Sequence, residues 1–91
     1  MDTIKTKIDD LFNELGFKLL YLNNNNLYFL NNHYYRIDYI ADLESYVIEY
    51  AYNYDDAMKN LFEDGDLYPV SLGEENLLCK MRKDLLKYYM T

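Results

Sequence analysis

Apolar residues recur at intervals of three and four near the start of the chain, and this spacing predicts a first helix over residues 2–16. The apolar stripe of this helix comprises Ile4, Ile8, Leu11, Phe12 and Leu15. Asp2 or Thr3 can cap its start, and Gly16 is suited to end it in the left-handed conformation. One side of the helix is therefore expected to pack on a core.

The next part of the chain alternates between runs of strand-forming residues and short polar breaks, which predicts four strands. The runs are "FKLLYL" (17–22), "LYFLN" (27–31), "YYRIDYIA" (34–41) and "SYVIEYAY" (45–52). Residues 23–26 and 31–33 are rich in asparagine, which tolerates positive φ and therefore favours turns. Four consecutive strands joined by short connections predict an antiparallel meander.

Two more helices are predicted after the strands. Residues 53–62 begin with Asn53 as a candidate cap, and Ser71 with Glu74 forms a capping box for a helix that runs to Tyr89. The residues between these helices are expected to cross in the open. The chain is thus predicted to be a single α+β domain, residues 1–91, with helices on one face of the sheet. Tyrosines on a partly open second face would give a binding surface.

Negative charge is concentrated in the second half of the chain. The net charge is −7, yet residues 38–75 hold eleven acids and only one base, Lys59, so this segment carries −10. An acidic surface repels nucleic acid phosphates and anionic membranes and attracts basic proteins. We therefore expect a protein partner with a basic surface, and no direct nucleic acid or membrane contact. Solubility alone is the competing explanation for the acids.

No recognisable catalytic or metal-binding constellation is present. His33 is the only histidine and falls in a predicted turn, where it is expected to be solvated. Asp64 and Asp66 have the spacing that opens a calcium loop, but no third ligand follows at the right distance. The single cysteine, Cys79, lies in a helical apolar pattern and is predicted to be buried. We expect a protein that is not an enzyme and binds neither metal nor cofactor.

Charged residues interrupt the apolar positions at the N-terminus, and no apolar run approaches the length that spans a membrane. A cytoplasmic protein is therefore expected.

The stretch "EDGDLYP" has two interpretations. Glu63, Asp64 and Asp66 follow the C-terminal end of a predicted helix, where the helix dipole disfavours negative charge. The stretch is then an acidic contact loop with Tyr68 as its aromatic anchor. Alternatively, the chain leaves the helix through a turn that tucks Leu67 and Tyr68 into the core. Under the first interpretation, the predicted partner-binding residues are Asp55, Asp56, Glu63, Asp64, Asp66, Tyr68, Glu74 and Glu75.

Residues 49–89 resemble the second half of small acidic immunity proteins that accompany bacterial polymorphic toxins. The resemblance is carried by Ala57, Asn60, the segment "FEDGDLYP" (62–69) and the closing "DLLKYY" (84–89). It implies an α+β protein that binds one toxin and blocks it without catalysis.

Two other classes fit the same features. A phage-encoded inhibitor of bacterial defence, of the anti-CRISPR or anti-restriction kind, could space carboxylates like phosphates and occupy the basic channel of a nuclease as a DNA mimic. A housekeeping scaffold or homodimer could instead associate through a tyrosine-lined sheet face. The DNA mimic predicts competition with DNA and steep salt sensitivity.

Overall fold

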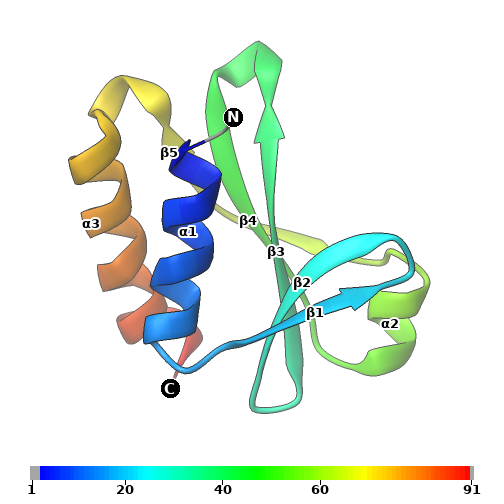
Figure 1. Ribbon diagram of the computed structural model, residues 1–91. Coiled ribbons are helices and arrows are strands. Elements are labelled where there is room, and N and C mark those ends of the chain that lie inside the picture. The colour runs from blue at the N-terminus through cyan, green and yellow to red at the C-terminus, as the bar shows by residue number, and fades with distance from the viewer. Residues whose placement is uncertain (1–2, 91) are drawn as a thin grey trace.

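The computed structural model describes residues 3–90 and has an α+β fold. Two helices, α1 (Thr3–Glu14) and α3 (Glu74–Asp84), lie side by side on one face of an antiparallel sheet (Figure 1). The five strands of this sheet are β1 (Lys18–Leu22), β2 (Asn25–Leu30), β3 (His33–Ile40), β4 (Ser45–Ala51) and β5 (Glu63–Pro69). Their order in the sheet is their order along the chain, as a meander requires.

The fifth strand corrects the predicted fold, which had four strands and two helices at the C-terminal end. The segment expected to cross in the open pairs with β4 and forms an edge of the sheet. The first of the two predicted helices is only α2 (Tyr54–Met58), a short helix that connects β4 to β5. A single long helix, α3, then follows β5 and continues as a π-helical turn (Leu85–Tyr89).

Short 3-10 segments lie at one end of the strands. The first (Ala41–Leu43) connects β3 to β4, and the second (Val70–Leu72) connects β5 to α3.

Helix α1 follows its apolar pattern. Ile8, Leu11 and Phe12 are buried in the core, and Ile4 and Leu15 pack against it. Gly16 has φ of +96°, and the Phe17 amide donates to the Phe12 carbonyl at 3.0 Å, a bond that closes helices ending in this conformation. The predicted helix end is therefore confirmed. Asp2, one of the two candidate caps, lies outside the described residues.

The asparagine-rich breaks are tight hairpin turns. Asn23, Asn24, Asn31 and Asn32 all have positive φ, as type I′ turns require of both central residues. Each turn is shorter than predicted, because β2 already begins at Asn25 and β3 at His33. His33 is thus a half-buried strand residue rather than a solvated turn residue.

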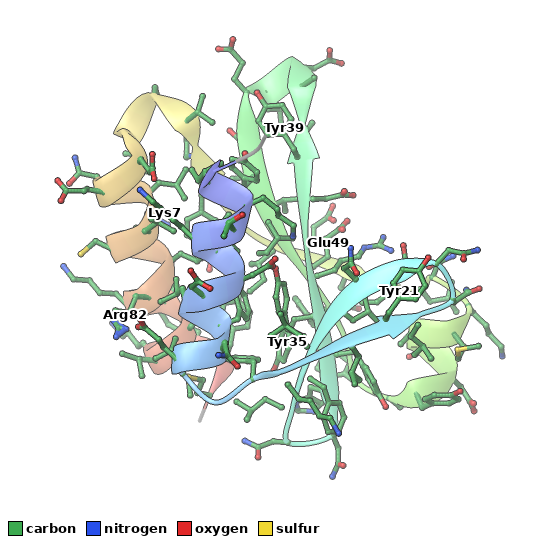
Figure 2. All side chains as sticks on the ribbon, in the orientation of Figure 1. Lys7, Tyr21, Tyr35, Tyr39, Glu49 and Arg82 are labelled. Atoms are coloured by element: carbon green, nitrogen blue, oxygen red, sulfur yellow. The ribbon has the colours of Figure 1, made fainter. Side chains whose placement is uncertain are left out.

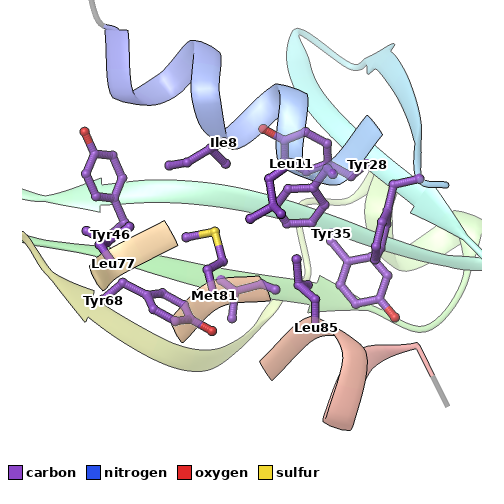
Figure 3. Close-up of a cluster of buried hydrophobic side chains, with 12 residues drawn as sticks. Ile8, Leu11, Tyr28, Tyr35, Tyr46, Tyr68, Leu77, Met81 and Leu85 are labelled. Carbon is purple, nitrogen blue, oxygen red and sulfur yellow. The ribbon is translucent and has the colours of Figure 1, made fainter. Parts of the chain in front are cut away.

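The main core lies between the sheet and the helix pair α1 and α3. The strands contribute large side chains to it from the face that carries the alternating tyrosines of β3 and β4, such as Tyr35 and Tyr46, and Figure 3 shows these rings facing Ile8, Met81 and Leu85 of the helical layer. Phe12 stacks on Tyr28 with ring centroids 3.9 Å apart. The buried tyrosines of this core are Tyr28, Tyr35, Tyr46 and Tyr68. The face with the alternating tyrosines is therefore the covered face of the sheet.

A smaller core forms on the opposite side, where α2 meets the strands. Leu27, Ala51 and Ala57 are buried there. Two amide side chains connect the β1–β2 hairpin to the end of α2: Asn23 donates to the Met58 carbonyl and Asn25 to the side chain of Asn60, each at 2.7 Å. The sheet therefore has helices on both sides, although α2 covers only one end of its second face (Figure 1).

Three local predictions have different outcomes. Asn53 caps α2, since its side-chain oxygen accepts from the Asp56 amide at 2.8 Å, as predicted. The predicted capping box of α3 is wrong, because Gly73 holds the cap position without a side-chain bond and Ser71 lies in a 3-10 segment. Cys79, predicted to be buried, is exposed.

Candidate functional site

The eight predicted partner-binding residues do not form one surface. They divide among the start of α2, the two sides of β5 and the start of α3, and α2 and the start of α3 lie at opposite ends of the molecule (Figure 1).

Asp55 and Asp56 lie in the first turn of α2, where negative charge is favourable beside the positive end of the helix dipole. The carboxylate of Asp56 also accepts from the side chain of Asn53 at 3.3 Å. The helix dipole therefore gives both acids a structural role at the start of α2.

Glu74 and Glu75 occupy the equivalent turn of α3. Glu74 forms an ion pair with Lys7 of α1, and Arg82 pairs with Glu14 across the same two helices at 3.4 Å. These contacts connect α1 to α3 and are distant from the other predicted acids.

Tyr68 cannot be an aromatic anchor for a partner, because its side chain is fully buried. Its hydroxyl donates to the carboxylate of Asp84 at 3.0 Å, and Lys80 lies 4.6 Å from the centre of its ring. Burial, followed by the hydrogen bond to Asp84, raises the pKa of this hydroxyl. The alternative interpretation was right for Tyr68, whereas Leu67 is exposed.

The acids of β5 point to both sides of the sheet. Glu63 is opposite Tyr50, and Asp66 accepts a hydrogen bond from the hydroxyl of Tyr89 at 3.1 Å, so both belong to the side covered by the helices. Asp64 is opposite Glu49 on the other side. Charged residues and irregular pairing also protect an edge strand from pairing with other chains, and β5 has both.

An acidic patch emerges on the second face of the sheet, formed by Asp38 of β3, Glu49 of β4 and Asp64 of β5 around one base, Arg36. Figure 2 shows Glu49 on the side of the strands away from α1 and α3. Glu49 is opposite Arg36 on one neighbouring strand and opposite Asp64 on the other. Asp38 and Asp64 are exposed.

Arg36 neutralises only Glu49 within this patch. Its Nε donates to Glu49 Oε1 at 2.7 Å, and its guanidinium carbon lies 4.2 Å from the centre of the Phe62 ring. Burial raises the pKa of the Glu49 carboxyl; Arg36 opposes this shift, and Asp38 and a hydrogen bond with Asp64 reinforce it. Burial is thus the main cause of the raised pKa, and the two neighbouring carboxyl groups add to it.

A second feature, which the sequence did not predict, is an aromatic pocket of about 470 Å³ at the end of the sheet next to the C-terminal turn. Five tyrosines line it: Tyr35, Tyr50, Tyr52, Tyr88 and Tyr89. His33, Gly65 and Asp66 complete the lining. The π-helical turn contributes two of the tyrosines, and such turns are frequent at functional sites.

Hydrogen bonds fix the positions of the pocket rings. Tyr35 donates to the Tyr89 carbonyl at 3.2 Å, and the Tyr89 hydroxyl donates to Asp66 and accepts from the Asp66 amide at 3.4 Å. A hydrogen bond with Tyr52 raises the pKa of Tyr50 to about 12. Burial raises the pKa of Tyr35 and of Tyr89 as well. These hydroxyls therefore stay protonated at neutral pH.

Within residues 3–90, no group of three His, Cys, Asp or Glu side chains could hold a metal ion. No helix in the same part of the chain is long and apolar enough to cross a membrane. No family model, curated protein or solved structure matches the chain.

Proposed function

We propose that the protein is a non-enzymatic inhibitor that binds a basic surface of another protein through the acidic patch. The observation that carries the proposal is the position of Asp64 directly opposite Glu49. Like charges in directly opposite positions on neighbouring strands destabilise a sheet, and a basic partner would relieve that repulsion.

Edge protection accounts for Asp64 on the edge strand β5 but not for the other acids of the patch. Asp38 and Glu49 lie on β3 and β4, which are inner strands of the described sheet and have no free edge. Residues that lower stability without a structural gain are typical of functional surfaces. The exposed carboxylates of Asp38 and Asp64 are the atoms that we propose contact the partner.

The resemblance of residues 49–89 to immunity proteins supports an immunity-type role, in which the chain blocks one toxin by steric and electrostatic means. The proposed contact surface differs from the predicted one. Tyr68 is excluded by its burial, and Glu74 and Glu75 lie at the start of α3 in the helical layer on the other face of the sheet. Asp55 and Asp56 begin α2, which packs on the same face of the sheet as the patch, but the helix dipole already accounts for their position.

The test compares two double variants with the same change in charge. The partner is captured from a lysate of the native host and titrated with wild type, with the patch variant Asp38→Asn/Asp64→Asn and with the control Asp10→Asn/Glu75→Gln, whose residues lie on α1 and α3. All four residues are exposed, so folding should be retained. The patch variant is expected to lose about tenfold or more in affinity and the control much less. Equal losses in the two variants would remove the patch from the proposal.

The same titration separates the toxin from the nuclease alternative. A DNA mimic requires a row of free carboxylates, whereas Glu49 is half-buried and paired with Arg36. We therefore expect that DNA added in excess leaves binding of the partner unchanged. Displacement by DNA, together with a steep loss of affinity in salt, would establish the anti-defence alternative instead.

A further inference from the structure

The residues that line the aromatic pocket favour one class of ligand over another. Its rings are those of five tyrosines and His33, and the carboxylate in its lining belongs to Asp66. The face of an aromatic ring carries partial negative charge, so rings and carboxylate together disfavour anions and favour cations. A volume of about 470 Å³ lies within the range of small-molecule sites.

The rings of the lining tyrosines are inclined to one another. Tyr50 meets Tyr52 at 70° with ring centroids 5.4 Å apart, and Tyr89 meets Tyr35 at 86° and 6.0 Å. Tyr50 and Tyr89 are inclined at 57°. None of these three pairs is stacked face to face, so the edge of one ring covers at most one face of its neighbour, and the other face is left for a ligand.

Charged groups of both signs lie near the lining tyrosines. Glu63 interacts with the Tyr50 hydroxyl, which brings a second carboxylate close to one of these rings. Lys87 places its ammonium 5.2 Å from the centre of the Tyr88 ring, and this positive charge opposes a second cation at Tyr88. The rings available to a ligand cation are therefore those of Tyr50, Tyr52 and Tyr89.

We propose that this pocket binds an organic cation, an alkylammonium or guanidinium group, between the faces of Tyr50, Tyr52 and Tyr89 and beside the carboxylate of Asp66. The cation comes either from a free small amine or from a lysine or arginine side chain of another protein. The pocket is on the opposite side of β5 from Asp64, so this proposal does not depend on the acidic patch.

The test uses four probes and records tyrosine ring signals by NMR. Choline represents a free amine, Nα-acetyl-lysine amide and Nα-acetyl-arginine amide represent protein side chains, and 3,3-dimethylbutan-1-ol is the neutral isostere of choline. At least one cationic probe is expected to give saturable shifts of the pocket tyrosines, and the neutral isostere is expected to give none. A tighter choline complex assigns the site to a free amine, and a tighter lysine or arginine complex assigns it to a protein side chain.

Three variants locate the binding. Tyr52→Ala removes a wall that is 56% exposed, and Asp66→Asn removes the charge but keeps an oxygen that can accept from Tyr89. Each is expected to weaken binding about fivefold or more. Tyr21→Ala is the control, because Tyr21 is 70% exposed on β1 and outside the pocket lining.

The proposal is overturned if no cationic probe saturates, if the neutral isostere binds equally well, or if Tyr52→Ala and Asp66→Asn bind like wild type. Loss of binding in Tyr21→Ala to the same extent would also overturn it, because the effect would then not belong to the pocket.

Discussion

Gly65 is the glycine at which an added side chain would clash most severely with neighbouring atoms. A Cβ atom built there would lie 2.5 Å from the Tyr89 hydroxyl, 2.9 Å from Ile48 Cγ2 and 3.0 Å from the Ile48 carbonyl oxygen. Tyr89 could rotate away only by losing its hydrogen bonds with Asp66. Ile48 is fully buried and its backbone is part of β4, so it has little freedom to move.

Gly65→Ala is therefore expected to destabilise the fold substantially. Overpacking a core costs about 1–3 kcal/mol, and the loss of a hydrogen bond adds about 1 kcal/mol, which together give about 2–4 kcal/mol. In a domain of this size the midpoint of thermal unfolding should fall by about 10 °C or more. Urea unfolding followed by circular dichroism measures the change in the free energy of unfolding.

A double-mutant cycle with Tyr89→Phe tests the mechanism. Removing the hydroxyl removes the 2.5 Å contact, so Gly65→Ala should cost at least about 1 kcal/mol less in that background. Gly16→Ala is the control: no atom lies within 4 Å of its added Cβ, and its cost comes from a backbone φ of +96°. Its cost should be the same in both backgrounds. Additive effects of Gly65→Ala and Tyr89→Phe, within about 0.5 kcal/mol, would refute the proposed packing.

Three further outcomes follow from contacts described above. Because burial raises the pKa of Glu49 above its ordinary value of 4.5, the folded state binds more protons than the unfolded state just above that pH, and stability falls as the pH rises through this window. Glu49→Gln should flatten this dependence in urea titrations across the window, and an unchanged slope would contradict it. Tyr68→Phe removes the hydrogen bond from Tyr68 to Asp84, while Lys80 still donates to that carboxylate at 3.1 Å, and should cost about 1 kcal/mol in thermal unfolding, a loss that an equally stable variant would disprove. Asn53→Ala removes the cap of α2 and should cost about 1 kcal/mol in urea, whereas Asn53→Ser keeps a capping oxygen and should cost less; equal costs would contradict the capping role.

The elements that depend on local chemistry were predictable from the sequence. The apolar stripe of α1, the left-handed Gly16 and the Asn-Asn turns all act within a few residues, and the structure confirms each of them. β5 was missed because glutamate, aspartate and glycine are poor strand formers. Pairing with β4 stabilises this strand although its residues have a low strand preference. Residues 63–66 alone give no indication of that pairing.

The candidate sites were not predictable, because they depend on contacts between distant parts of the chain. Asp38, Glu49 and Asp64 meet only because three strands pair in one particular register, which shifts between Val47 and Glu49. The aromatic pocket draws on β3, β4, β5 and the C-terminal turn. The sequence signal that points to the pocket is the spacing of aromatic residues such as Tyr50 and Tyr52, which equally suits the predicted strand over residues 45–52.

The consecutive strand order has a consequence for how the chain folds. Each strand pairs with its neighbour in sequence, so the sheet can grow by short loop closures, which cost little entropy. In sequence, helices α1 and α3 are separated by all five strands of the sheet, and contacts between residues so far apart along the chain form slowly. A chain with its sheet formed but α3 undocked would expose Tyr46, Ile48 and Tyr68 to solvent. During that interval, the carboxylates of β5 would be the main barrier to aggregation along the open edge of the sheet.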